Sequence, residues 1–123
     1  MTPLTIAAPH LVVTKSGPAT LGRTLNLGEW GEFAIDVNNA GLTDAWDVVI
    51  EDVLPRSPSG GMCDMQPEIL GAQVFQADGA TPAPGKGPLT PGTDFAVEWT
   101  GTPQCEWTLT MLTPAASIGP GER

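Results

Sequence analysis

The sequence predicts an all-β fold, either a two-sheet antiparallel sandwich or a barrel, made of short strands joined by turns. Polar and apolar residues alternate in several short segments, which is typical of strands with one buried face. The 15 glycines and 13 prolines among 123 residues lie between these segments and supply the turns. Because no apolar periodicity near 3.6 residues is sustained, we expect almost no helix.

The expected strands follow one another along the whole chain. They are Leu11–Lys15, Glu32–Asn38, Asp44–Val53, Ile69–Gln76, Asp94–Thr100 and Cys105–Leu112, with a weaker candidate at Thr20–Leu27. Turn residues separate them at Ser16–Pro18, Pro55–Gly61, Asp78–Pro88 and Thr90–Gly92.

The strongest pattern is the strand, turn and strand between Trp30 and Pro55. Period-two alternation assigns one face of each strand to the core, with Asn39–Asp44 as the reversal between them. The same parity argument extends to the later strands. The expected core is Phe33, Ile35, Val37, Trp46, Val48, Ile50, Val97, Trp99, Trp107 and Leu109.

Composition and charge limit the function. The length fits a single domain over residues 1–123, and the net charge of -9 excludes non-specific binding to nucleic acid or to an anionic membrane surface. No apolar run approaches the roughly 20 residues that cross a bilayer. The first residues lack the basic start of a signal peptide. We therefore expect a fragment of a longer parent, with any export signal upstream.

Three segments resemble the DUF11 repeat family of bacterial and archaeal surface proteins. They are Leu11–Pro18, with its V-T-K strand, the block Phe33–Pro55, with V-N-N-A-G and I-x-D-V-L-P, and Ile118–Glu122, with P-G-E. This resemblance implies an immunoglobulin-like β-sandwich of about seven strands, repeated in tandem in an exported cell-surface protein. The family has no assigned activity. The chain departs from the family in lacking the Tyr-Thr-rich strand and in a long insert from Ser59 to Gly101.

The C-terminal residues Ser117–Arg123 are typical of a turn that leads into a strand, so we expect this stretch of sequence to lack the last strand of the sandwich. An exposed strand edge pairs readily with another strand. We therefore expect an edge that stays open or pairs with another copy of the chain.

No residue pattern points to catalysis, a cofactor or a metal. The single histidine, His10, lies near the terminus, and no nucleotide-binding, zinc or catalytic motif is present. The acidic residues are scattered over outward strand positions, and Asp44 and Asp47 make the closest approach to a cluster. A solvated acidic surface is the main interpretation, and a weak calcium site in a loop is the alternative.

Two residues carry a sharper alternative beside an ordinary interpretation. Trp30 is expected to pack in the core or at a strand edge, or else to be an exposed contact for a glycan or protein ligand. Lys15 is expected to extend its amine off its strand into solvent. Buried instead, it could form an isopeptide bond, for which Asn38, Asn39 and Asp52 are the candidate partners.

Cys63 and Cys105 are the only cysteines and are expected to form a disulfide. Cys105 begins an inward-facing series, and Cys63 follows a glycine-rich turn that can bring it close. In an exported domain such a pair is usually oxidised, whereas two buried free thiols would indicate a cytosolic protein.

The function expected from the sequence is that of a non-enzymatic spacer module whose partners are neighbouring repeats of the same chain. The alternative is a binding module for a glycan or protein, with the ligand held by Trp30 and by the long loops Pro55–Gly61 and Asp78–Pro91.

Overall fold

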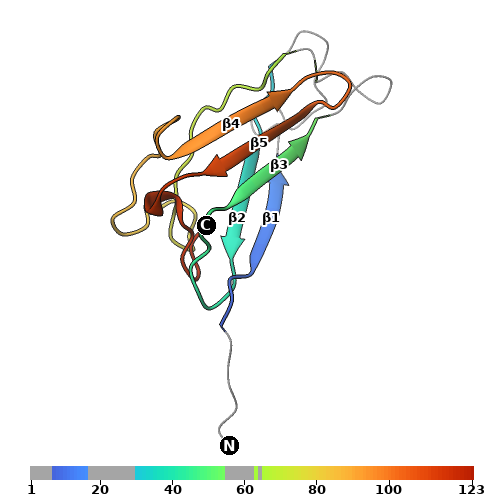
Figure 1. Ribbon diagram of the computed structural model, residues 1–123. Helices are drawn as coiled ribbons and strands as arrows, with labels where there is room; N and C mark the ends of the chain where they lie inside the picture. Colours follow the sequence, from blue (N-terminus) through green and yellow to red (C-terminus); the bar gives the residue numbers. More distant parts are fainter. Residues whose placement is uncertain (1–6, 17–29, 55–62, 64) are drawn as a thin grey trace, which may run out of the picture.

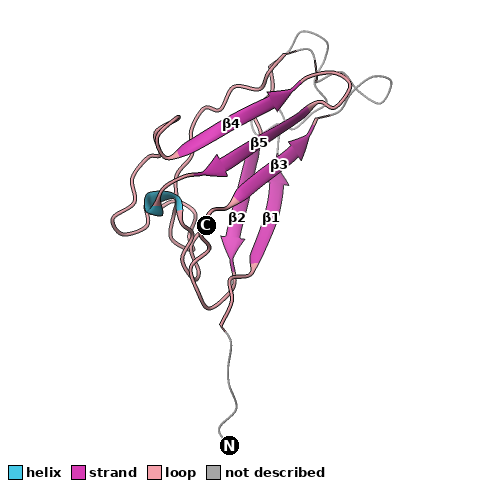
Figure 2. Ribbon diagram, viewed as in Figure 1, coloured by secondary structure: helices cyan, strands magenta, loops and turns pink. Residues whose placement is uncertain are grey.

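Two antiparallel sheets form the framework of the chain in a computed structural model, which describes residues 7–16, 30–54, 63 and 65–123 (Figures 1 and 2). The first sheet pairs β1 (Leu11–Ser16) with β2 (Ala34–Asn39). The second has the order β3-β5-β4, with β3 at Val49–Val53, β4 at Phe95–Thr100 and β5 at Glu106–Met111. A short 3-10 turn, η1 (Pro114–Ala116), is the one helical element of the described residues. The all-β prediction is therefore confirmed.

The expected boundaries of β1, β2, β4 and β5 lie within two residues of the observed ones, and the other expected strands differ more. The expected strand Asp44–Val53 is shorter, because Asp47 has a positive φ of 52° and interrupts the extended backbone before β3. The expected strand Ile69–Gln76 is wrong as a strand, since only an isolated bridge between Phe75 and Pro82 forms there. Thr20–Leu27 lies outside the described residues.

One hydrophobic cluster joins the two sheets. Trp107 and Leu109 are buried on β5, the middle strand of its sheet, which has a neighbour on each side. Val37 of β2 belongs to the same cluster, so the first sheet contributes to the core as well. The cluster also contains Ala45, Val48, Leu54, Leu89, Phe95, Cys105, Met111, Ala116 and Ile118.

The prediction of burial is wrong for two residues of the expected core. Trp46 is 56% exposed, because the left-handed turn at Asp47 rotates it outward and leaves Ala45 and Val48 as the buried residues. Phe33 precedes β2 and is 36% exposed. The remaining members of the expected set are buried or pack, partly buried, against the cluster.

The turn after β2 is held by a crossing of the N-terminal segment. The N–H of Ala40 donates to the C=O of His10 at 2.7 Å, and the N–H of Leu42 donates to the C=O of Ala8 at 3.1 Å. A Cβ at Gly41 would lie 2.4 Å from the Ala8 oxygen, so this position requires glycine.

Asn39 organises the same region from inside. Its side chain is fully buried, and its amide group donates to the carbonyls of Thr43 and Ile118 at 2.8 and 2.7 Å. Its side-chain oxygen accepts from the N–H groups of His10 and Gly41 at 3.1 and 2.9 Å. One amide thus ties the N-terminal segment, the turn and the C-terminal segment together.

The C-terminal residues turn onto the edge of β2. The N–H of Glu122 donates to the C=O of Gly119 at 2.9 Å, and Gly121 has a φ of 76°, which matches a type II turn with proline and glycine at its centre. Gly121 donates to the C=O of Asn39, and the N–H of Asn39 donates to the C=O of Glu122, so two residues face one across the pair. This is a β-bulge that begins with a left-handed glycine.

Candidate functional site

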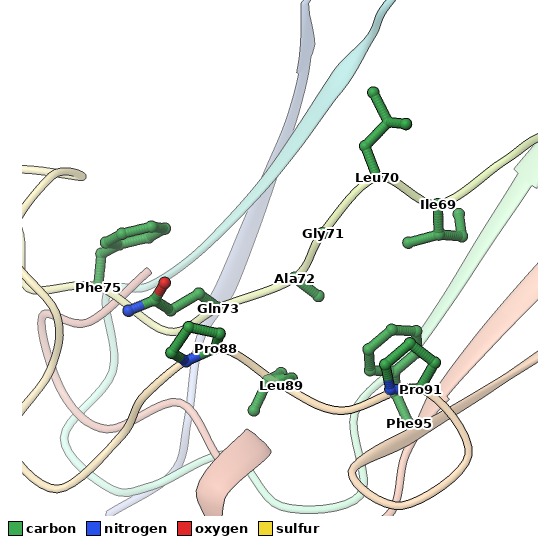
Figure 3. Close-up of a pocket in the computed structure, with 10 residues that line it drawn as sticks. All are labelled: Ile69, Leu70, Gly71, Ala72, Gln73, Phe75, Pro88, Leu89, Pro91 and Phe95. Atoms are coloured by element: carbon green, nitrogen blue, oxygen red, sulfur yellow. The ribbon is translucent and has the colours of Figure 1, made fainter.

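An open hollow of about 420 Å³ lies between residues 69–75 and the segment that leads into β4 (Figure 3). The residues that line it are all apolar or neutral, among them Ile69, Leu70, Gln73, Leu89 and Phe95. An aliphatic or aromatic group could occupy it. The described residues of its walls include no acid, base or nucleophile, so proton transfer there would need groups from elsewhere.

His10 and the acidic residues do not assemble into a reactive cluster. His10 is exposed, and its backbone N–H is bonded to Asn39. Within the ranges that the structure describes, no three His, Cys, Asp or Glu side chains are placed to hold a metal ion. Asp44 and Asp47, the closest approach to an acidic cluster in the sequence, are no exception.

Trp30 is 74% exposed, so the expectation that it packs in the core or at a strand edge is wrong. Its indole face is available to solvent, as a stacking contact for a ligand requires. Strand parity does not determine the position of Trp30, because this residue comes before β2 begins at Ala34.

Of the two loops expected to carry a ligand, the structure describes one. Pro55–Gly61 lies outside the described residues. In Asp78–Pro91, the Asp78 carboxylate accepts bonds from the Thr81 hydroxyl and from the N–H groups of Thr81 and Ala80. These bonds lower the pKa of Asp78 to about 2, and the bond from the Thr81 hydroxyl has the largest effect. The carboxylate is thus engaged in shaping its own turn.

Lys15 and Asp52 form a bridge between the two sheets. The Lys15 Nζ lies 2.7 Å from the Asp52 Oδ2, and the Trp107 Nε1 donates to the same oxygen at 3.2 Å. The Phe33 ring centroid lies 5.4 Å from the Lys15 Nζ, within cation–π range. The side chains of Lys15 and Asp52 are 37% and 17% exposed, which is consistent with a charged, partly solvated pair.

The structure brings Lys15 to one of its three candidate isopeptide partners. Asn38 is opposite Val12 and on the other face of the sheet from Lys15, whereas the Asn39 amide is fully used in hydrogen bonds. A bond between Lys15 and Asp52 would join Nζ to Cγ and release water. It would require a neutral amine and an acid to transfer protons, so this link stays a prediction that an intact mass lower by one water would verify.

Cys63 and Cys105 form the disulfide that the sequence predicts. The Cα atoms are 5.5 Å apart across a separation of 42 residues. Cys105 is fully buried, and its C=O accepts a bond from the N–H of Leu54, directly after β3. The bridge therefore fixes the segment after β3 to the connection between β4 and β5.

Sequence reasoning missed a pair of ion pairs at the C-terminal segment. The Arg123 guanidinium binds the Asp36 carboxylate, with Nε 3.1 Å from Oδ1, and this contact raises the pKa of Arg123. The Lys86 Nζ lies 2.6 Å from the Glu122 Oε1 and 2.8 Å from the carbonyl oxygen of Ser117. The outward parity of Asp36 in β2 was the available signal, but its partner lies 87 residues away.

Comparisons with protein families, curated proteins and solved structures found no match to this chain. Among the described residues, no helix has the length and apolar character needed to span a membrane.

Proposed function

We propose that this chain is a non-enzymatic, immunoglobulin-like β-sandwich module that spaces other domains in an exported, multi-repeat surface protein. The observation that carries the proposal is the Cys63–Cys105 disulfide, which uses both cysteines of the chain. Disulfides persist in oxidising compartments and are rare in the cytosol. The DUF11-like segments agree with the same reading.

The charge and the hydrogen bonds of the module suit such a role. The net charge of -9 keeps closely spaced copies soluble. The termini of the described core are held in place by Asn39 and by the ion pairs of Glu122 and Arg123. A spacer needs both ends fixed to its folded body, because flexible ends would make the distance between the flanking domains variable.

The test joins three copies head to tail, produced in an oxidising compartment, and measures the solution shape by small-angle scattering. A spacer gives an extended particle whose maximum dimension grows by a constant step from one to two to three copies. Copies that collapse onto each other, or that move independently about loose joints, would contradict the proposal. The single copy serves as the reference for the step.

A second candidate, a binding module for a glycan or protein, is favoured by the exposure of Trp30. Aromatic faces supply large contact area at low entropic cost. A glycan array of the wild type, Trp30→Ala and Trp46→Ala separates the roles, because Trp46 is also exposed, at 56%. Binding lost only with Trp30→Ala would support this candidate. Equal loss in both variants, or no binding at all, would count against it.

A further inference from the structure

One edge of β2 is largely unpaired among the described residues. The N–H of Ala40 donates to the C=O of His10, and bonded pairs alternate along an antiparallel ladder. The N–H and C=O groups of Ile35, Val37 and Asn39 therefore point away from β1. The backbone N–H and C=O of Asn39 bond to Glu122 and Gly121 in the C-terminal turn. Those of Ile35 and Val37 have no partner in the part of the chain that the structure describes.

A second open edge belongs to the extended segment 71–75. The carbonyls of Val74 and Ala72 accept bonds from residues 83–89 on one side of this segment. Phe75 points to the opposite side, where it exchanges two backbone bonds with the C-terminal residue at 2.6 and 2.9 Å. Alternation along the segment gives Gly71 and Gln73 the orientation of Phe75.

Arg123 lies between these two edges. Strands are spaced about 4.8 Å apart, so the edges are about 10 Å from each other where Arg123 separates them. Beyond Arg123 the space is bounded by Ile35 and Val37 on one side and by Gly71 and Gln73 on the other. The last two have no backbone partner among the described residues. We call this space the strand slot.

Pairing with either edge gives the same pattern of inward and outward residues for a strand in the slot. A strand that continues from Arg123 would run antiparallel to β2, and its first residue would exchange backbone bonds with Val37. The side chain of that residue would point inward, next to Val37 and Val74, which are 6% and 3% exposed. The second residue would point to solvent, and the third would point inward next to Ile35 and Ala72. The slot thus fits apolar residues at the first, third and fifth positions and polar ones between them.

We propose that the strand slot seats the segment connecting this module to the next module of the same chain, as a further strand of the first sheet. The proposal rests on the proposed tandem arrangement. The direction of residues 121–123, which already bond both edges at the mouth of the slot, supports it. A strand tethered at Arg123 also avoids most of the entropy cost of association, which a separate peptide would bear.

The experiment appends six residues to Arg123 and compares two sequences of equal composition. The in-phase variant adds Val-Thr-Val-Thr-Val-Lys, and the out-of-phase variant adds Thr-Val-Thr-Val-Lys-Val. Seating should raise the Tm of the in-phase variant by about 10 °C over the unextended chain, with much less gain out of phase. A third variant, with proline as the first added residue, lacks the N–H that would bond Val37 and should lose most of the gain.

Amide hydrogen exchange locates the effect, starting from the unextended chain. We expect the amides of Val37, Gly71 and Gln73 to exchange rapidly there and to be protected at least tenfold more in the in-phase variant. Equal Tm gains in both phases, or no gain in either, would overturn the proposal. So would a dimeric unextended chain with these amides already protected, since a second copy would then fill the slot. The scattering test of the spacer role is independent, and an extended array without a phase effect would refute only the slot.

Discussion

Replacing Asn39 by alanine should be the most costly single polar substitution in the described core. The change removes four hydrogen bonds, two donated by the amide and two accepted by its oxygen. Each is worth about 1 kcal/mol net, and the Ile118 carbonyl is left buried without this partner. We expect a loss of about 3 to 4 kcal/mol in the free energy of unfolding, a large share of the 5–15 kcal/mol typical of a domain.

Asn38→Ala is the matched control, because its side chain is half-buried on the other face of the same strand. It should cost less than about 1 kcal/mol. Urea unfolding followed by tryptophan fluorescence measures both variants, with the slope of the transition checked for two-state behaviour. Equal costs for the two variants would refute the reasoning that the buried amide holds the three segments together.

Three further outcomes are expected. Cys63→Ser with Cys105→Ser opens a loop of 42 residues and should cost up to about 4 kcal/mol on the chain-entropy model, measured by urea unfolding against the oxidised wild type. Trp46→Ser should change the Tm little, since the ring is exposed, and a large drop would place it in the core after all. The pKa of Asp78 is lowered from 3.8 to about 2 in the folded chain, so its stabilisation is present above pH 4 and is lost as the pH falls toward 2. The Tm of Asp78→Asn should accordingly fall less steeply over this range than that of the wild type, and parallel curves would contradict the assignment.

The alternation of polar and apolar residues was sufficient to place most strands, because this alternation depends only on residues that are neighbours in the sequence. β1, β2, β4 and β5 lie where alternation predicts them. The error at Trp46 has a local cause that alternation hides: the residues around Asp47 keep their polar and apolar order, while one positive φ reverses which of them face inward. Aspartate adopts this conformation more readily than most residues, so the turn was allowed by the sequence but not demanded by it.

The candidate sites depended on contacts between distant residues, which a single sequence does not reveal. Asn39 reads as a turn residue, yet its role requires Ile118, 79 residues away. The pair of Lys15 and Asp52 was among the sequence hypotheses, but only the arrangement of the two sheets selects Asp52 over the two asparagines. The disulfide was predictable because two cysteines allow one pairing.

The disulfide also determines how the module would respond to tension along the chain. β4 lies wholly within the 42-residue loop that Cys63 and Cys105 close, whereas β1, β2, β3 and β5 lie outside it. A stretched, oxidised chain therefore could not extend this loop, and its contour length would be shorter by about 140 Å than that of the reduced chain. Oxidation would thus limit how far the chain can be stretched. The loop between Cys63 and Cys105 would stay closed after the strands outside it have unfolded.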